Sequence, residues 1–203
     1  MRNSVRFLLA FVSVIFSSNI VYASGYAVYT QGAKELGMLN AVVAHSEGPA
    51  SNFYNPALIN DLDGTQFEIG TTIIYPSREY SDLTGNTTDG KTTVFFPSTL
   101  FLSHKLNESL SLGFGVYSPF GLGTKWPKGW DGRYLTTEGN LTTFNFNPNI
   151  AWKISDRLSL AGGIDYLYGD AILKRKIDLA SLIPYPGYPD GSQKFAGDGD
   201  GWG

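Results

Sequence analysis

The sequence predicts an all-β membrane protein, a transmembrane antiparallel β-barrel, on three observations. From Gln66 onwards, apolar and polar residues alternate over several segments, as in a strand with one apolar side. These segments run for roughly 9 to 15 residues, whereas strands of globular proteins usually hold about 5 or 6. The polar side is mainly Gly, Ser, Thr and Asn, with fewer charges than a strand face in water carries. A tilted strand needs about 9 to 11 residues to cross a bilayer, so the lengths favour a membrane barrel over the alternative, a soluble β-sandwich or jelly roll.

Residues 1–23 have the features of a cleaved secretory signal. A basic start precedes the apolar run Phe7–Phe16, and a small-residue cleavage pattern ends at Ala23. The apolar run is shorter than the roughly 20 residues that a spanning helix needs. We therefore expect export, with a mature chain that begins at Ser24.

The composition of the remaining chain suits one exported β domain. About 180 residues are enough for a single substantial domain. The sequence has no cysteine, which disfavours a small disulfide-stapled module. Its net charge is −3 and charged residues make up 16%, so a basic nucleic-acid-binding face is not expected.

Five strands are predicted in order, and the alternation is least regular in the second. They cover residues 66–75, 91–106, 109–117, 141–153 and 158–168. Aromatic residues gather at strand ends, as in the girdles of membrane barrels. These aromatic residues are Tyr75, Tyr117, Trp152, Tyr166 and Tyr168.

The predicted connections are of two kinds. Those at 107–109 and 154–157 are short, whereas those at 77–91 and 119–139 are long. Outer-membrane barrels have short turns on one side and long loops on the other. The final residues, 196–203, read as the onset of a sixth strand. Because single-chain barrels have at least about 8 strands, we expect this chain to be the N-terminal part of a longer barrel.

The stretch SNFYNPALIN, at 51–60, suits neither a regular helix nor a strand. Its apolar residues favour burial, but Pro56 interrupts both kinds of ladder and restricts the backbone of Asn55. A packed turn is predicted here, of the kind that could plug a barrel lumen.

Several motifs, taken in order, resemble the outer-membrane long-chain fatty acid transporter family (FadL-like, OMPP1/FadL/TodX type). Asn55, Pro56 and Ala57 match its Asn-Pro-Ala signature, within a Gly- and Ala-rich leader that follows the signal. Further matches are YSPFGLGTKW at 117–126, the hairpin at 147–169 and the terminal GWG. The resemblance implies a hatch inside a barrel of about fourteen strands. Residues 24–64 would form the hatch, and residues 65–203 the first five to six strands with their loops.

The resemblance also implies a function. Members of the family take up long-chain fatty acids or other hydrophobic compounds passively and release them sideways into the outer membrane. We therefore expect a monomer in the bacterial outer membrane whose partners are fatty acids, aromatic or aliphatic hydrocarbons and membrane lipids, with no cofactor. The alternative is a general outer-membrane porin or a structural barrel.

Candidate ligand contacts lie in the long loop after the third strand. We interpret its apolar residues as an outer ligand groove whose neighbouring cations attract a carboxylate. The alternative is that these aromatic residues pack on neighbouring loops or sit among headgroups. The apolar residues are Phe120, Leu122, Trp126 and Trp130, and the cations are Lys125, Lys128 and Arg133.

Arg175 is the candidate contact for a carboxylate inside the barrel. Counting alternate residues from Asp165 places Arg175 on the inner face, and its planar guanidinium suits both oxygens of a carboxylate. Lys174 and Lys176 would point outward. One bulge would reverse this assignment. The alternative is a solvated strand end that binds lipopolysaccharide phosphates.

Residues around the third strand match the position of the family's lateral opening. Pro119 has no N–H to donate to a neighbouring strand, and Gly121 follows it closely. Ser118 and, on the second strand, Thr99 complete the predicted opening. Within the hatch, Asn55, Pro56 and Ala57 are the predicted gate elements.

An enzymatic function is not predicted. The histidines are His45 and His104, and neither shows the spacing of a catalytic triad. We predict no catalytic residue and no metal ligand in this chain.

Overall fold

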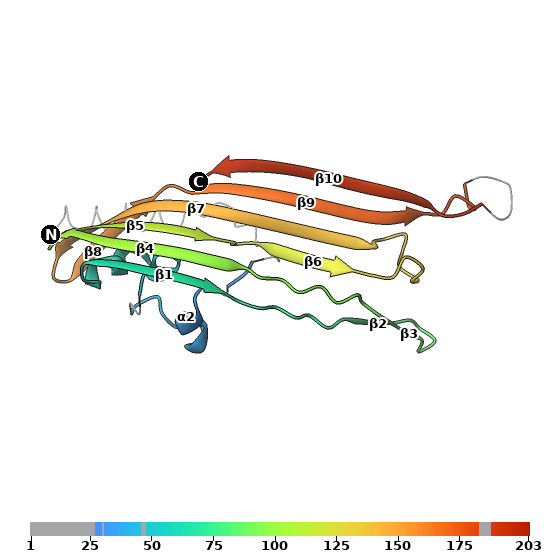
Figure 1. Cartoon of the computed structure of the whole chain (residues 1–203), viewed down its shortest axis with the longest axis horizontal. Helices are drawn as coiled ribbons and strands as arrows, with labels where there is room; N and C mark the ends of the chain where they lie inside the picture. Colours follow the sequence, from blue (N-terminus) through green and yellow to red (C-terminus); the bar gives the residue numbers. More distant parts are fainter. Residues whose placement is uncertain (1–26, 30, 46–47, 183–187) are drawn as a thin grey trace, which may run out of the picture.

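The computed structural model describes residues 27–29, 31–45, 48–182 and 188–203. The predicted signal at 1–23 lies outside the described residues. The structure is an open antiparallel sheet with short helices packed against one end (Figure 1). None of the helices in the described part of the chain is long and apolar enough to cross a membrane. The helices are α2 (Ala33–Gly37), α3 (Ser51–Tyr54) and the 3-10 helix η1 (Pro56–Asp61).

Eight strands form the main sheet in the order β1-β4-β5-β7-β9-β10, with β6 and β8 paired to β7. A separate two-stranded sheet, β2-β3, extends the connection between β1 and β4. The all-β antiparallel fold predicted from the alternation is therefore confirmed. The strands are β1 (Thr65–Thr71), β2 (Glu79–Ser81), β3 (Thr87–Asp89), β4 (Ser98–Asn107), β5 (Leu110–Tyr117), β6 (Gly121–Lys125), β7 (Glu138–Ser155), β8 (Leu158–Gly163), β9 (Tyr166–Ile177) and β10 (Gly191–Trp202).

The strand boundaries differ from the predicted ones in several places: β1 ends at Thr71 rather than Tyr75, and β7 starts at Glu138 rather than Leu141. The second strand starts at Ser98, because Pro97 has no N–H for a ladder. The predicted fifth strand is divided at Ile164 into β8 and β9. Part of the predicted 119–139 loop forms β6, and the sixth strand is a full twelve residues, because β10 pairs with the whole of β9.

Strand β7 is a continuous eighteen-residue strand whose neighbours on both sides are broken. On one side β5 pairs with its second half and β6 with its beginning. On the other side β8 pairs with the second half of β7 and β9 with its first half. The breaks occur at 118–120 and 164–165, so the sheet has two interruptions beside one unbroken strand.

The two faces of the sheet differ as predicted. Thr99, Ser103, Ser111 and Asn149 are buried on the face that carries the helices. Apolar side chains cover the other face and are exposed, which suits contact with lipid. These are Phe67, Ile69, Leu102, Leu112, Phe144, Phe146, Ile150 and Trp152.

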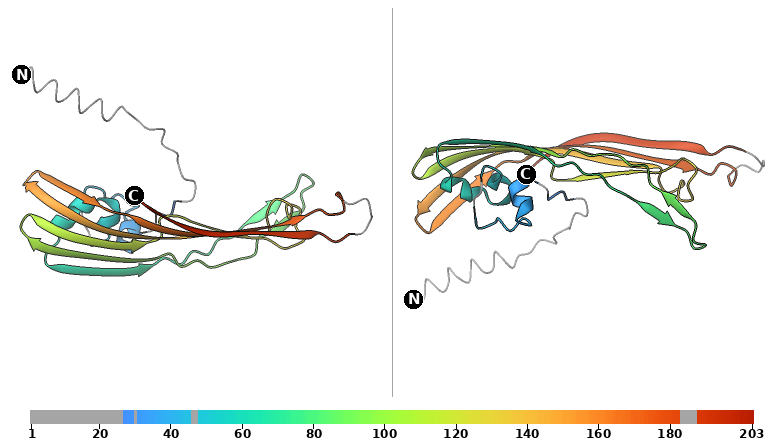
Figure 2. Two further views of the ribbon diagram at one scale, coloured as in Figure 1. Left: turned by 90° about the horizontal axis from the view of Figure 1, so that it is seen from above. Right: turned by 60° about the horizontal axis from the view of Figure 1, so that its bottom comes forward.

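The N-terminal helices pack in the hollow of the curled end of the sheet (Figure 2). Ala50, Phe101 and Tyr117 form a buried cluster, and the Phe53 ring lies 5.0 Å from the Tyr117 ring, edge to face. Tyr117 was predicted to belong to an interfacial girdle, and that assignment is wrong. It follows the buried parity of β5 and is only 7% exposed.

Asn52 anchors these helices to the sheet. Its Nδ2 donates to the carbonyl of Leu102 at 3.0 Å, and the residue is buried. The opposing position is Gly113, where an added Cβ would lie 2.1 Å from Asn52 Oδ1 and 2.3 Å from Asn149 Oδ1. Glycine at 113 therefore leaves the space that two buried amides occupy.

Candidate functional site

The break between β5 and β6 is a bulge in the wall of the sheet. Tyr117 faces Asn145 and Gly121 faces Thr142, so three residues lie opposite two. The Thr143 side chain replaces the lost ladder at this point. Its Oγ1 accepts from the Phe120 N–H at 3.1 Å and donates to the Phe120 carbonyl at 2.6 Å.

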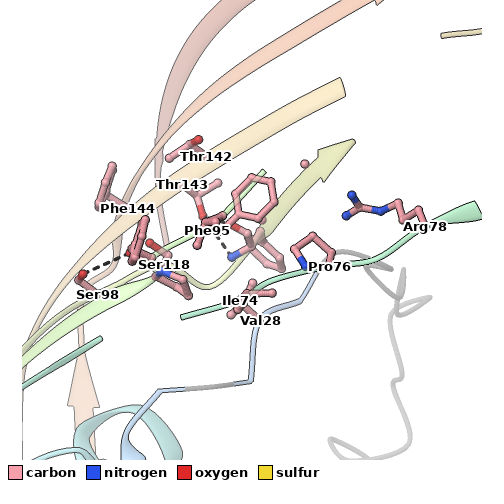
Figure 3. A pocket seen from close by; sticks show the side chains of 16 residues that line it. Val28, Ile74, Pro76, Arg78, Phe95, Ser98, Ser118, Thr142, Thr143 and Phe144 are labelled. Atoms are coloured by element: carbon pink, nitrogen blue, oxygen red, sulfur yellow. Dashed lines mark hydrogen bonds between the residues drawn. The ribbon is translucent and has the colours of Figure 1, made fainter. Parts of the chain in front are cut away.

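A cavity of about 550 Å³ opens at this break (Figure 3). It lies between β6 and the segment before β4, and Val28 of the N-terminal segment borders it. The lining is mostly apolar, as a hydrocarbon-binding site requires. Its apolar residues are Val28, Ile74, Pro76, Val94, Phe95, Phe96, Pro97, Phe120 and Phe144, and its polar ones include Arg78, Ser98, Ser118, Thr142 and Thr143.

The structure brings part of the predicted opening to this cavity. Ser118 and Gly121 line it, and Pro119 lies at the break. Thr99 does not line it, because its side chain is buried on the hatch-facing side of β4, opposite Gly70. Ser98, one residue earlier, takes that place in the lining.

Gly123 determines how closely the two sides of the cavity approach. A Cβ added there would lie 1.9 Å from Cζ of Phe95, so the ring covers the glycine directly. The segment before β4 is joined to its surroundings by the isolated bridge from Phe95 to Ile74, by the Thr72 N–H, which donates to the Pro97 carbonyl at 3.1 Å, and by the Lys91 N–H, which donates to the Lys125 carbonyl at 2.7 Å. Sequence reasoning missed Phe95, because this contact joins segments that are far apart in the chain.

A second cavity, of about 400 Å³, lies on the hatch side of the same break. Phe53, Phe120, Leu167 and Trp202 give it apolar walls. Phe120 lines both cavities.

Polar groups of the second cavity converge on Asp165. Its Oδ1 accepts from the side-chain amides of Asn145 and Asn147, the latter at 2.9 Å. Asn145 also donates to the Tyr117 hydroxyl at 2.8 Å. Asp165 thus lies at the break between β8 and β9. Neutral amide donors fix the position of its carboxylate on the inner side of the sheet.

The Asn-Pro-Ala signature shapes the hatch locally. Asn55 caps η1: its Oδ1 accepts from the N–H of Ala57 at 3.2 Å, and Pro56 occupies the first helical position. Asn55 Nδ2 donates to the carbonyl of Val43 at 2.9 Å, which joins two hatch segments. None of the three residues lines the two cavities at the break. Their role as a gate therefore stays a prediction.

Among the described side chains, Phe120, Trp126 and Trp130 of the predicted outer groove do not line a common cavity. Phe120 lies at the wall break, and the side chain of Leu122 lies outside the described part of the structure. Trp126 and Trp130 stack with ring centroids 4.4 Å apart. Trp130 is 8% exposed, packs edge to face on Tyr80 and donates to the Thr136 carbonyl at 2.7 Å. These contacts are the loop packing that the sequence left open as the alternative.

Arg133, one of the three loop cations, forms an ion pair with another loop residue, Asp190. Its Nε pairs with Asp190 Oδ2 at 2.8 Å, and Tyr134 donates to the other carboxylate oxygen. Hydrogen bonds from Tyr134 and Arg133 lower the pKa of the Asp190 carboxyl below its ordinary value. This pairing joins the connection before β7 to the connection before β10.

Arg175 keeps the face that was predicted for it. The pairing of β9 with β10 has no register shift from Tyr166 to Ile177, so no bulge reverses the parity. Its Nε donates to Gln193 Oε1 at 2.7 Å. Arg175 borders a cavity of about 300 Å³ together with Leu135, Leu173 and Phe195. A guanidinium beside apolar side chains can hold a carboxylate and the start of its tail. Leu135 and Phe195 were not predicted.

Among the described residues, no group of three or more His, Cys, Asp or Glu side chains could hold a metal ion. His104 instead bonds the Thr65 hydroxyl through Nδ1 at 2.7 Å.

An antiparallel sheet with one lipid-type face, long loops and helices packed on its inner side is the architecture of part of a plugged barrel of the outer-membrane type. Residues 14–201 match the family described as "Outer membrane protein transport protein (OMPP1/FadL/TodX)", and the chain belongs to this family.

Three relatives illustrate the similarity. The chain is 34% identical over 125 residues to a putative outer membrane protein of Neisseria meningitidis, covering 56% of this chain and 26% of that protein. It is 26% identical over 173 residues to the long-chain fatty acid transport protein of Escherichia coli, covering 81% and 38%. The crystal structure of a Pseudomonas aeruginosa FadL homologue superposes with a TM-score of 0.66 at 21% identity, covering 88% and 48%. The chain therefore spans less than half the length of these relatives.

Proposed function

We propose that the full-length protein takes up hydrophobic molecules across the outer membrane through a hatch-plugged barrel and releases them laterally through the wall at the β5–β6 break. The observation that carries this proposal is the position of Phe120, which lines an inner cavity on one side and the wall cavity on the other. Membership of the family and the printed function of the Escherichia coli relative support long-chain fatty acids as one ligand class. Aromatic and aliphatic hydrocarbons are the other.

Lateral release also has an energetic reason. Moving a methylene from an apolar site into water costs about 0.8 kcal/mol, so releasing a long acyl chain into water costs on the order of 10 kcal/mol. Moving the same chain from an apolar cavity into lipid has almost no cost in transfer free energy, because both environments are apolar. A passive carrier of such ligands therefore gains most from an exit that faces the hydrocarbon core of the membrane.

The wall exit is tested by the variant Gly123→Leu. A leucine there overlaps the Phe95 ring, which must move into the cavity. The displaced ring and the added side chain should obstruct the passage and lower uptake of labelled oleate and hexadecane by about tenfold or more. The control is Gly162→Leu, on β8, where an added Cβ meets no atom within 4 Å. Uptake is measured with the full-length protein in cells that have no other carrier. Unchanged uptake by the Gly123 variant would exclude this exit, and rapid passage of small sugars in liposome swelling would favour a porin.

The head-group role of Arg175 has a separate test. Arg175→Ala should weaken binding of a long-chain acid by about tenfold to a hundredfold, the usual effect of losing a charge-assisted hydrogen bond. Neutral hydrocarbons should bind as before. Isothermal calorimetry with matched acid and alkane ligands measures both, and Arg157→Ala, at the β7–β8 turn, is the charge-matched control. Equal weakening of both ligand types would remove the proposed contact with the carboxylate.

A further inference from the structure

A row of charged side chains crosses four neighbouring strands at the loop end of the sheet. Lys125 on β6 lies directly opposite Glu138 on β7, and Glu138 lies opposite Lys174 on β9. Lys174 in turn lies opposite Lys194 on β10. Directly opposed residues of antiparallel strands share a face, and strands lie about 4.8 Å apart. The four side chains therefore form one line, about 15 Å long. The strand ends that carry them, the end of β6 and β9 and the start of β7 and β10, lie at the end of the sheet opposite the helices (Figure 1).

This row lies on the lipid-type face of the sheet. The odd-numbered residues Thr143 and Asn145 of β7 are buried on the hatch side, whereas the even-numbered Phe144 and Phe146 are exposed on the other. The pairing of β7 with β9 runs from Glu138 to Phe146 without a register shift. Glu138 and its partners in the row thus continue the face of Phe144 and Phe146.

The row also lies beyond the apolar band. From Trp152, the aromatic residue near the other end of β7, to Glu138 the strand climbs about 35 Å along the barrel axis, at about 3.3 Å per residue and a tilt of about 40°. The outward apolar band of such barrels is about 25 Å tall. The row is therefore about 10 Å above the hydrocarbon boundary, at the level of lipid headgroups.

Positive charge at this level is far from neutralised. A cavity of about 370 Å³ at the row is bordered by six lysines and by Arg175, whose side chain belongs to the opposite face of β9, in a chain of fifteen Lys and Arg residues and net charge −3. Glu138 is its single carboxylate and contacts Lys174 at 3.0 Å and Lys125 at 3.9 Å. The seven cations are Lys91, Lys125, Lys128, Lys174, Arg175, Lys176 and Lys194.

The close spacing of these cations favours binding of an anionic ligand. Lys174 and Lys194 are directly opposed, and like charges in that relation destabilise a sheet. Within the described residues Lys91, Lys128 and Lys194 form no ion pair. A ligand with several negative charges would offset this repulsion, and one that resides at the membrane surface would meet the row directly.

We propose that this lysine row binds the phosphorylated headgroup of the outer-leaflet glycolipid, lipopolysaccharide. The face turned to lipid, the headgroup height and the excess of cations over carboxylates all match a polyanionic lipid head with its acyl chains against the apolar band below. Lys125 is two residues from Gly123, so the bound lipid lies beside the wall cavity.

The test compares two triple variants of the full-length protein in detergent micelles. Lys125→Gln, Lys174→Gln and Lys194→Gln together remove the row. Lys105→Gln, Lys153→Gln and Arg157→Gln remove the same charge near the hatch end of the sheet. Binding of bisphosphorylated lipid A is followed by native mass spectrometry, and retention of the folded band in unheated gel electrophoresis confirms that both barrels form.

The row variant should bind bisphosphorylated lipid A at least about tenfold more weakly than the parent protein, and the control should match the parent within about twofold. Dephosphorylated lipid A should bind the parent as weakly as the phosphorylated lipid binds the row variant. Equal affinity of the parent and the row variant would overturn the proposal. So would displacement of the lipid by inorganic phosphate at millimolar concentration, because the site would then recognise a free anion.

Discussion

Oxidation of the double variant Ala27→Cys/Phe120→Cys is expected to lower uptake of labelled oleate by at least about tenfold, and reduction to restore it. Ala27 and Phe120 form an isolated antiparallel bridge, and Val28 donates its N–H to the Pro119 carbonyl at 2.8 Å. The N-terminal segment thus supplies the strand partner that the broken wall lacks. If ligands leave through this break, the segment must detach, and a disulfide prevents it from doing so.

The geometry favours this bond. Paired Cα atoms of antiparallel strands lie about 4.5 to 5.5 Å apart, within the range that a disulfide spans. The sequence contains no cysteine, so no competing bridge can form. The single variant Phe120→Cys controls for loss of the ring, and the reduced double variant controls for both substitutions. Uptake that is the same in the oxidised and reduced forms would mean that the N-terminal segment stays in place during transport.

Substitution of Gly113 by alanine is expected to release the hatch from the sheet. The added methyl would overlap the amides of Asn52 and Asn149, so Asn52 must give up its bond to the Leu102 carbonyl. Overpacking costs about 1–3 kcal/mol and an unsatisfied buried amide costs about 1–3 kcal/mol, so docking of the hatch should weaken by several kcal/mol.

Hydrogen exchange measured by mass spectrometry on the full-length barrel checks this. Peptides from residues 48–62 should lose protection by about a hundredfold or more, while peptides from β7 keep theirs. Gly162→Ala, with open space around its added Cβ, is the matched control. Unchanged protection of the hatch in the Gly113 variant would show that Asn52 is not its main anchor.

The sequence predicted the strands well because alternation is a local signal. Leu110 to Tyr117 and Leu141 to Lys153 show it clearly, and both segments form strands with the expected buried and exposed faces. The parity of Arg175 could also be counted, since β9 has no register shift. Pro119 marked the position of the break through its missing N–H.

Other features depended on pairing between distant segments. Phe95 meets Gly123 across the wall, and neither residue signals the other in the sequence. The sequence predicts Trp130 as a ligand contact, whereas its ring packs against Tyr80 and Trp126. The bulge at 118–120 also exchanges the two faces between β5 and β6. Even-numbered Val116 of β5 lies opposite even-numbered Phe146, whereas odd-numbered Lys125 of β6 lies opposite even-numbered Glu138. Such a one-residue shift cannot be counted from alternation alone.

The unbroken strand β7 has a consequence for the permeability of the membrane. Both interruptions of the sheet lie in its neighbours, and β7 pairs with them on either side of each break. The wall can therefore change locally at mid-height while the stagger of the strands, and with it the circumference of the barrel, is fixed at both rims. If ligands leave through this break, as we propose, a hydrophobic molecule reaches the membrane without a continuous channel for ions and small solutes between the outside and the periplasm.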